Sequence, residues 1–199
     1  LAAASIAQVH RARTKEGREV VLKIRRPGIV KTIHTEMEML HDLAALVKMR
    51  LGRDSTIDPV RMVNEFSQAV TKEVDFANER RNQQRFIRNF ESDLTIHVPE
   101  VFEAYSSEGI LTMEFIDGIK PSNIEQLENA GLAPKTVASR GADFVLKQVF
   151  DHGFFHTDPH PGNFLILPDN ILSPLDFGQV GRLAVQDRML LQYIVLSIV

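Results

Sequence analysis

The sequence predicts an α+β fold of two lobes, and three observations lead to it. Two strand-like segments near the N-terminus, "AQVHRAR" and "REVVLKIR", are joined by the turn "TKEG". Three stretches with the apolar spacing of amphipathic helices begin near Lys31, Asp58 and Pro134. A hairpin, "FLIL" and "ILSPL" around "PDN", lies near the C-terminus. Strands with helices, followed by a helical part that carries a small hairpin, are typical of an α+β protein.

The first predicted helix runs from Lys31 to Leu51, and Gly52 ends its apolar pattern. Its stripe, at spacings of four and three, consists of Ile33, Met37, Leu40, Ala44, Val47 and Leu51. The stripe covers only about two and a half heptads, which favours packing within its own domain over a coiled-coil seam.

The second predicted helix begins at Asp58, a suitable N-cap, with Pro59 at its first position. We expect it to continue towards Phe90. Its apolar stripe consists of Val60, Val63, Phe66, Val70, Val74 and Ala77. The segment "VPEVFEAYSSEGILTMEFIDG" then predicts two strands around the turn "SSEG".

The third predicted helix begins at Pro134 and ends at Gly153. One face carries Val137, Ala142, Val145, Leu146 and Val149. After the hairpin and "DFG", the sequence becomes helix-like again within about ten residues of Gly178, and no Ala-Pro-Glu motif follows. This leaves little room for a surface that docks a peptide substrate.

Composition limits the possible functions. The chain has 199 residues and 44% hydrophobic residues, which is enough for a packed core. Its net charge of -3, from 23 basic and 26 acidic residues, argues against a nucleic-acid binder. The absence of cysteine excludes disulfides and thiolate metal sites. We expect the chain to be a piece of a longer protein, truncated at both ends. Its last apolar run is too short to span a bilayer and is expected to form a buried helix.

Three polar residues near the C-terminus have the order that phosphoryl transfer requires. Asp158 and Asn163 lie five residues apart, and Asp176 follows the predicted hairpin. The reaction needs a carboxylate near the attacking hydroxyl and oxygen ligands that hold Mg²⁺ on the phosphates. Mg²⁺ keeps several waters and takes few protein carboxylates, so one Asp and one Asn suit it. The order Asp, Asn, Asp-Phe-Gly is the kinase-type arrangement.

Two other interpretations of the stretch "FFHTDPHPGN" remain open. His156, Asp158 and His160 alternate and could bind Zn²⁺ from a strand, although Pro159 and Pro161 break a regular strand. Alternatively, His156 is a loop histidine that bonds backbone carbonyls, which is also compatible with a rigid catalytic loop.

Lys23 is a single cation inside the apolar strand "VVLKI". It either extends to solvent from a strand edge or pairs with a buried acid and nucleotide phosphates. Asp75, Glu79 and Asn82 share one face of the second predicted helix, and the two acids are candidate partners of Lys23. The opening "AAASIAQV" has alanine where a kinase phosphate loop has glycine, so the loop must be stiffer.

Together these segments resemble the UbiB/AarF family of atypical protein-kinase-like proteins. The resemblance covers nearly the whole chain and includes "AAASIAQVHRA", "VVLKIRRPGI", "KEVDFANERRN", "LTMEFIDGI", "FFHTDPHPGN" and "DFGQVG". It implies a protein-kinase-like fold, with residues 1–116 as the N-lobe-like part and 117–199 as a partial C-lobe. It also implies ATP and Mg²⁺ as cofactors, and an atypical kinase or ATPase activity that supports ubiquinone biosynthesis or lipid metabolism.

The resemblance also implies roles for individual residues. Lys23 corresponds to the nucleotide lysine, with Glu79 as its helix partner. Asp158 corresponds to the catalytic aspartate, and Asn163 and Asp176 to the metal ligands. The remaining correspondences are Ala4, Ser5 and Ala7 in the nucleotide loop, Glu114 and Ile116 in a hinge at residues 113–116, and Glu73 with Asp75 in the family's acidic motif. Ala7 replaces a glycine that many members have, and the family's N-terminal Lys-x-Gly-Gln motif is absent from this sequence.

The partners implied are a nucleotide, a small-molecule or lipid-like acceptor and a membrane surface, but not nucleic acid. The location implied is the cytoplasmic face of a bacterial membrane, or a mitochondrion or plastid. Two other functions remain open. One is an aminoglycoside- or choline-kinase-like phosphotransferase, since these share the His-x-Asp-x-x-x-x-Asn loop. The other is a pseudokinase scaffold that binds nucleotide without turnover.

Overall fold

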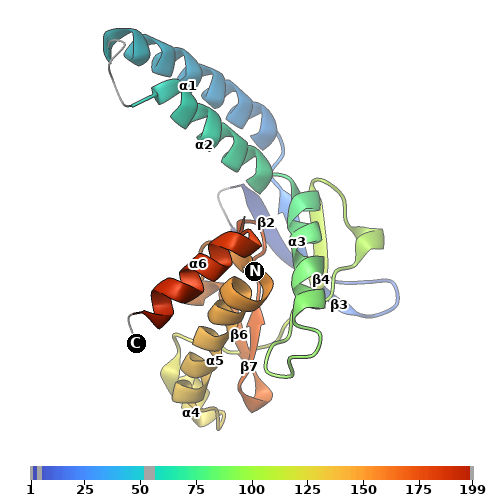
Figure 1. The fold of residues 1–199 in the computed structure, drawn as a ribbon. Coiled ribbons are helices and arrows are strands. Elements are labelled where there is room, and N and C mark those ends of the chain that lie inside the picture. Colours follow the sequence, from blue (N-terminus) through green and yellow to red (C-terminus); the bar gives the residue numbers. More distant parts are fainter. Residues whose placement is uncertain (1, 4–5, 52–56, 198–199) are drawn as a thin grey trace. The chain divides into compact units, whose positions relative to one another are not determined.

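The computed structural model describes residues 2–3, 6–51 and 57–197 (Figure 1). The chain divides into two compact units, one of residues 1–78 with 103–112 and the other of residues 79–102 with 113–199. This division places residues 79–102 with the C-terminal unit, whereas the sequence-based division at residues 116 and 117 places them in the N-terminal part. Helices account for 52% of the structure and strands for 19%, in agreement with the predicted α+β class.

The first unit contains a sheet with the strand order β1-β2-β3-β4. Its strands are β1 (Ala2–Ala3), β2 (Ala7–Arg13), β3 (Glu19–Arg25) and β4 (Ile110–Glu114). The predicted turn between β2 and β3 is confirmed, because Gly17 N–H donates to the Thr14 carbonyl at 3.0 Å. Gly17 has φ +87°, a conformation that glycine adopts at low cost.

Helices α1 (Ile29–Leu51) and α2 (Pro59–Glu73) lie side by side as a hairpin (Figure 1). The predicted stripe of α1 is only partly correct: Met37 and Ala44 are buried, whereas Leu40, Val47 and Leu51 are exposed. The predicted cap of α2 is confirmed, since the Asp58 carboxylate accepts from the N–H groups of Val60 and Arg61. Gly52, the predicted stop of α1, lies outside the described residues. The hairpin also carries exposed apolar residues, among them Met39, Leu43, Leu46, Met62 and Phe66.

The prediction that the second helix continues to Phe90 is wrong. Helix α2 ends at Glu73, and a separate helix, α3 (Phe76–Asn89), follows. The Asp75 carboxylate accepts from the Ala77 N–H at 2.9 Å, as an N-cap does. Aspartate competes with the helical backbone for such bonds, so it favours a new helix start over a continuous helix. Asp75 therefore precedes α3 and does not share a helix face with Glu79.

The first of the two strands predicted around "SSEG" is also absent. The segment before β4 forms only an isolated bridge between Val101 and Met113, followed by a 3₁₀ turn at Glu103–Tyr105. Pro99 has no N–H to donate to a ladder. The Thr112 hydroxyl also donates to the Tyr105 carbonyl at 2.5 Å, so side chains replace part of the expected backbone pairing.

The second unit contains the remaining helices and two small sheets. The helices are α4 (Ile124–Asn129), α5 (Pro134–Leu146) and α6 (Val185–Leu196), and a π-helical turn at Lys147–His152 extends α5. Strand β5 (Phe154–His156) pairs with β8 (Val180–Arg182), and β6 (Phe164–Leu167) pairs with β7 (Ile171–Pro174). Gly153, with φ +56°, ends the π turn as predicted. Helix α4 and the β5–β8 pair were not predicted.

The core of the second unit is rich in phenylalanine. Phe86, Phe90, Phe144, Phe154 and Phe177 are all at most 4% exposed. Phe86 lies at the centre, with ring centroids 5.2 Å from Phe154 and 5.3 Å from Phe177. This core joins α3, α5, β5 and the "DFG" segment into one packed body.

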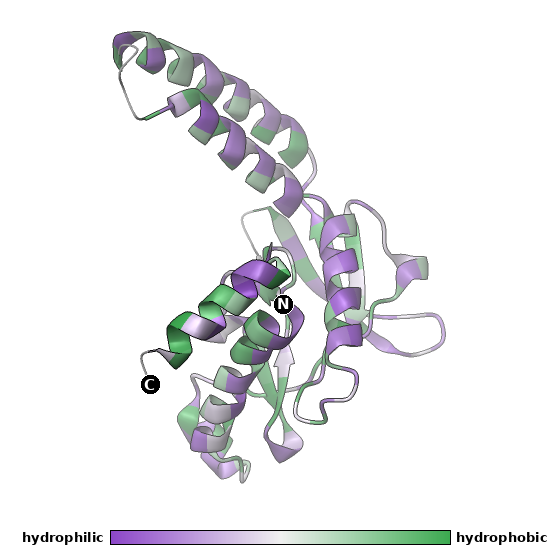
Figure 2. Ribbon diagram, in the orientation of Figure 1, coloured by the Kyte–Doolittle hydropathy of each residue, from purple (hydrophilic) through white to green (hydrophobic). Residues whose placement is uncertain are grey.

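The predicted apolar face of α5 is only partly correct. Val137 is buried with Phe144, whereas Ala142 and Leu146 are exposed. The buried face instead continues through Gln148 in the π turn. The apolar residues of α5 outside the core therefore face open space. The expectation that the last apolar run forms a buried helix is wrong, because α6 has no buried residue; Figure 2 shows apolar residues along it. Among the described helices, none has the length and apolar character needed to cross a membrane.

His152 predicts a pH dependence of stability. Burial has the largest effect on the pKa of His152 and lowers it. The charge of Asp151 raises this pKa, whereas the charges of Arg85, Lys147 and Arg188 lower it further. Its ring also packs edge-on against Phe90, with centroids 5.0 Å apart. A histidine with a lowered folded pKa binds fewer protons in the folded state, so the free energy of unfolding decreases as the pH falls below about 6.5.

The test is urea denaturation at pH 7.5 and 5.5. We expect His152→Gln to show a smaller loss of stability on acidification than the parent chain. His34→Gln is the control, because the His34 side chain is 75% exposed. Equal pH dependence in the parent and His152→Gln would contradict the prediction.

Candidate active site

Strand pairing brings the "HTD" and "DFG" segments together. In the β5–β8 pair, His156 is opposite Val180, and the Thr157 N–H donates to the Gln179 carbonyl at 3.1 Å. Asp158 therefore follows directly after a strand whose partner begins just after Gly178. The pairing fixes the start of the loop against the chain segment that follows Asp176.

The β6–β7 hairpin brings Asn163 next to Asp176. Its register places Phe164 opposite Pro174, so the residues just outside the ladder are Asn163 and Leu175. The Leu175 N–H donates to the Asn163 carbonyl at 2.8 Å. Asp176 is the next residue, so the hairpin brings together two residues that lie thirteen positions apart in the sequence.

Asp158, Asn163 and Asp176 line one small pocket, together with His156. Its apolar walls include Phe86, Phe144, Phe164 and Phe177. The structure thus places the three polar residues with kinase-type spacing at a common site within the second unit. The Asp158 side chain is exposed, and among the described residues its carboxylate has no hydrogen-bond partner.

The loop histidines organise the backbone of this site. Nδ1 of His156 accepts from the Asp158 N–H at 3.1 Å, and Nδ1 of His160 accepts from the Gly162 N–H at 3.0 Å. The expectation that His156 bonds carbonyls is therefore wrong, because its Nδ1 accepts from an N–H. In the neutral ring Nε2 then carries the proton, and this buried atom has no partner in the described part of the chain.

The ligands available in this pocket suit Mg²⁺ better than Zn²⁺. Asn163 Nδ2 points towards the Asp158 carbonyl at 3.4 Å, which leaves its side-chain oxygen as a ligand. One Asp176 oxygen, Oδ1, accepts from the Gly178 N–H at 3.0 Å and fixes the carboxylate. Oxygen ligands from one carboxylate and one amide fit the hard Mg²⁺ ion, which keeps water in its other positions. Over the described ranges, no group of three or more His, Cys, Asp or Glu residues is placed to hold a metal.

Helix α3 packs against the "DFG" segment, residues 176–178. Asn82 is 4% exposed, and its Nδ2 donates to the Phe177 carbonyl at 2.9 Å. Glu79 is 2% exposed, and a Cβ at Gly178 would lie 3.9 Å from its Oε2. The same Cβ would lie 3.4 Å from Asp176 Oδ1, also an ordinary contact distance, so Gly178 lies beside both carboxylates.

Sequence reasoning missed Gln148, which positions the start of the loop. Gln148 is 1% exposed, its Oε1 accepts from the His156 N–H at 2.8 Å, and its Nε2 donates to the Phe144 carbonyl at 3.2 Å. The signal that could have found it is its spacing, because it lies four residues after Phe144 and eleven after Val137 on the buried face. A polar residue in such a stripe is buried and needs partners.

Lys23 and the predicted nucleotide loop belong to the first unit and are described within it. Lys23 lies in β3 opposite Val9, and its ammonium is 5.4 Å from the centroid of the Phe76 ring. Ala7 begins β2, is 0% exposed and pairs with Arg25 of β3. Ala4 and Ser5 lie outside the described residues. In the acidic motif, Glu73 ends α2 and Asp75 caps α3.

The predicted hinge at residues 113–116 is held by its own polar contacts in the second unit. The Glu114 carboxylate accepts from the Glu100 N–H at 3.1 Å and lies 2.9 Å from His97 Nε2. The Glu114 N–H also donates to the Glu100 carbonyl at 2.9 Å. Ile116 is 7% exposed. This segment is therefore anchored by side-chain and main-chain bonds together.

The fold and this site define a protein-kinase-like protein, and comparisons with known proteins agree. Residues 1–199 match the family described as "ABC1 atypical kinase-like domain", so the chain belongs to this family. A curated relative, "Probable protein kinase UbiB" from Aliivibrio salmonicida, is 42% identical over 193 residues. That match covers 94% of this chain but 36% of the relative, so the chain spans about a third of its length. The resemblance to the UbiB/AarF family is confirmed.

Solved structures also resemble this fold. The complex of Rv3197 with erythromycin from Mycobacterium tuberculosis has a TM-score of 0.74 and 27% identity, covering 92% of this chain and 45% of that one. The Rio2 kinase–ADP/Mg²⁺–phosphoaspartate complex from Chaetomium thermophilum has a TM-score of 0.50 and 18% identity, covering 98% of this chain and 51% of that one. The second likeness supports the kinase-like fold alone.

Proposed function

We propose that this chain is the catalytic part of a Mg²⁺–ATP-dependent atypical kinase or ATPase of the UbiB type, which supports ubiquinone biosynthesis or lipid-related metabolism. The observation that carries the proposal is the convergence of Asp158, Asn163 and Asp176 on one pocket. The name of the UbiB relative supports it, and the likeness to the Rio2 kinase supports the kinase-like fold that it requires.

The proposed chemistry divides among the polar residues. Asp158 accepts the proton of the acceptor hydroxyl, or of water, as its oxygen attacks the γ-phosphorus of ATP. The bond from that phosphorus to the bridging oxygen breaks, and ADP leaves. Asn163 and Asp176 hold Mg²⁺, which neutralises charge on the phosphate oxygens. By family resemblance, Lys23 contacts the nucleotide phosphates, Glu79 orients Lys23, and the backbone at Glu114 and Ile116 meets the adenine.

The support network explains why these roles need a rigid site. Gln148 fixes the backbone of His156, and Asn82 fixes the carbonyl of Phe177. Phosphoryl transfer depends mainly on positioning and electrostatic stabilisation, so fixed backbone segments on both sides of the pocket contribute directly to rate. The erythromycin complex of the Rv3197 relative further supports testing small molecules as acceptors or ligands.

The experiment is an ATP hydrolysis assay on the full-length protein, with and without anionic lipid vesicles and quinone-precursor phenols. We expect Mg²⁺-dependent ADP release that increases with at least one of these additions, because the acceptor or its membrane surface completes the site. An EDTA-treated sample is the control. Nucleotide binding without turnover under every condition would favour the pseudokinase scaffold instead, and phosphorylation of an aminoglycoside or choline would favour the small-molecule phosphotransferase.

A further inference from the structure

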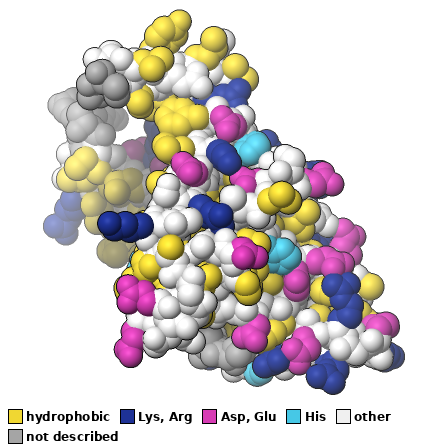
Figure 3. All heavy atoms as spheres, turned by 90° about the horizontal axis from the view of Figure 1, so that it is seen from below, with side chains coloured by type: hydrophobic (Ala, Val, Ile, Leu, Met, Phe, Trp, Pro, Cys, Tyr) yellow, Lys and Arg dark blue, Asp and Glu magenta, His cyan; other side chains and the backbone are white. Residues whose placement is uncertain are grey.

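A buried glutamine of α3 bonds to the segment that precedes the predicted hinge. Gln83 is 0% exposed, and its Nε2 donates to the Pro99 carbonyl at 2.8 Å. Figure 3 shows charged side chains at the surface of the molecule, where such groups are solvated, whereas a fully buried amide needs bonded partners. The other polar atom of Gln83, Oε1, is buried without a hydrogen-bond partner among the described residues. Because such an acceptor weakens the fold, stability alone does not explain Gln83.

Pro99 lies next to the residue that holds the hinge. The Glu114 N–H donates to the Glu100 carbonyl at 2.9 Å, and the Glu100 N–H donates to the Glu114 carboxylate at 3.1 Å. Nε2 of Gln83 also lies 3.9 Å from the sulfur of Met113, the first residue of the hinge. Gln83 therefore contacts both the hinge and the segment that holds it.

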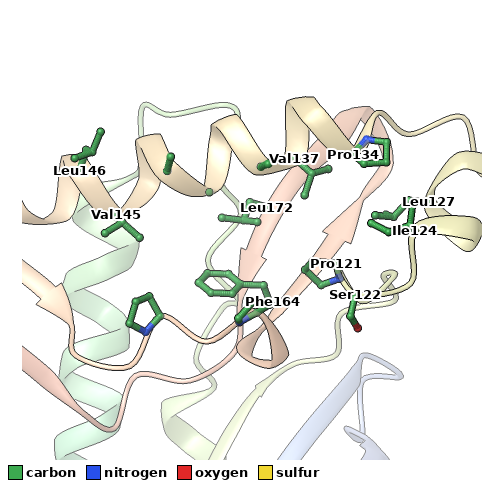
Figure 4. Close-up of a pocket in the computed structure, with 15 residues that line it drawn as sticks. Pro121, Ser122, Ile124, Leu127, Pro134, Val137, Val145, Leu146, Phe164 and Leu172 are labelled. Atoms are coloured by element: carbon green, nitrogen blue, oxygen red, sulfur yellow. The ribbon is translucent and has the colours of Figure 1, made fainter.

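Strand β7 fixes the other end of the same segment. The His97 N–H donates to the Leu172 carbonyl at 2.9 Å, and the Leu172 N–H donates to the Thr95 carbonyl at 2.9 Å. Leu172 is 3% exposed, and its side chain lies beneath α5 (Figure 4). Residues 95–100 are thus bonded to the core through β7 and to α3 through Gln83.

The residue before Gln83 bonds to a different part of the proposed nucleotide site. Nδ2 of Asn82 donates to the Phe177 carbonyl, next to the proposed metal ligand Asp176. Two successive residues of α3 therefore reach the segment behind the hinge and the "DFG" segment. All of these residues belong to the second unit. Substitutions at the two positions can separate an effect on adenine binding from an effect on the chemical step.

We propose that Gln83 is a positioning residue for nucleotide binding: it holds residues 99–100 so that the main chain at Glu114 and Ile116 keeps the position in which it meets the adenine. The inference rests on the proposed function for the identity of the ligand, but the anchoring of the hinge can be measured without nucleotide. The adenine does not react, so its contacts are equally strong before and during phosphoryl transfer. Loss of such contacts raises KM and leaves kcat unchanged.

The kinetic test replaces Gln83 by methionine in the full-length protein. Methionine has a similar length but cannot donate to the Pro99 carbonyl, and we expect the KM for ATP to rise about fivefold or more while kcat stays within about twofold. Asn82→Leu should instead lower kcat about tenfold or more, because the Phe177 carbonyl beside Asp176 is no longer held. Gln68→Met makes the same chemical change at an exposed position of α2 and should match the parent.

Hydrogen exchange of the full-length protein without nucleotide tests the anchor itself. In the parent, we expect the Glu114 amide to exchange as slowly as the Ile166 amide, which donates to the Ile119 carbonyl at 2.8 Å. In Gln83→Met, exchange at Glu114 should become about tenfold faster or more, while exchange at Ile166 stays the same.

The outcomes separate this inference from the proposed function. An unchanged KM for ATP in Gln83→Met, or equal Glu114 exchange in the variant and the parent, would overturn the inference. Lower kcat with unchanged KM in both Gln83→Met and Asn82→Leu would also overturn it, because both residues would then only maintain the fold. If Gln83→Met does not fold, the parent decides: exchange at Glu114 as fast as in an exposed loop overturns the inference, and slow exchange supports it. A parent that neither binds nor hydrolyses ATP would reject the proposed function, and the exchange result would still decide whether Gln83 holds the hinge.

Discussion

Asp176→Asn is expected to abolish Mg²⁺-dependent nucleotide binding while leaving the fold intact. The substitution keeps the shape of the side chain and an oxygen that can accept the Gly178 N–H, which Asp176 Oδ1 does now at 3.0 Å. It removes the negative charge of the proposed carboxylate ligand that lies in the pocket with Asn163. Because Mg²⁺ neutralises charge on the phosphates, we expect the variant to lose the part of its ATP affinity that depends on Mg²⁺.

Thermal unfolding with ATP measures this loss. Ligand at a hundred times its dissociation constant stabilises a folded protein by about 2.7 kcal/mol, which is a shift of roughly 5–10 °C for a chain of this size. We expect the parent to show a shift with ATP and MgCl₂ that EDTA removes, and Asp176→Asn to show no difference between the two.

Two further variants make this test specific. Asp169→Asn is the matched control, because Asp169 lies at the tip of the β6–β7 hairpin and outside the small pocket. Asp158→Asn should retain the Mg²⁺-dependent shift but lose turnover by about a hundredfold or more, as expected for a base and not a metal ligand. Unchanged binding in Asp176→Asn would reject its assignment as a ligand.

Phe86→Ala is expected to lower the free energy of unfolding by about 3–5 kcal/mol, the largest stability effect predicted for this chain. Phe86 is 1% exposed and contacts four other phenylalanine rings, with centroid distances from 5.2 Å to Phe154 up to 6.3 Å to Phe144. Truncation removes these contacts and leaves a cavity at the centre of the second unit.

Urea denaturation measures the effect, with Phe66→Ala as the matched control. Phe66 is 52% exposed on α2, so we expect a change of less than about 1 kcal/mol there. The Phe86 variant should also weaken nucleotide binding, because Phe86 lines the small pocket and packs on Phe177 beside Asp176. Equal free energies of unfolding in Phe86→Ala and Phe66→Ala would contradict the assignment of Phe86 to the centre of the core.

Local signals were sufficient for the elements that they specify. The β2–β3 and β6–β7 hairpins, α1 and the start of α2 follow from alternation, helical spacing, and the cap formed by Asp58 and Pro59. The break between α2 and α3 was missed because the capping preference of Asp75 outweighed an apolar stripe that continued through Val74 and Ala77. Helix α4 was missed because six residues are too few to establish a helical period.

The composition of the small pocket was predictable, but the means by which it is assembled was not. The order and spacing of Asp158, Asn163 and Asp176 identified the set of residues. The β5–β8 pair that aligns the loop with "DFG" has three residues per strand, too few for a recognisable alternation. The spacing of Gln148 marks it as part of the buried face, but its bond to the His156 N–H depends on the π turn that follows α5, which the sequence did not predict.

The β6–β7 hairpin sets the separation of Asn163 and Asp176 by ladder register and not by the number of residues between them. The tip at residues 168–170 can therefore change in length while the ladder still holds Asn163 beside Asp176. A one-residue slip within either strand has a different consequence, because it turns alternate side chains to the opposite face and moves the carboxylate out of reach of the amide. In this part of the molecule, an added residue at the turn keeps Asn163 beside Asp176, whereas an added residue within one strand does not.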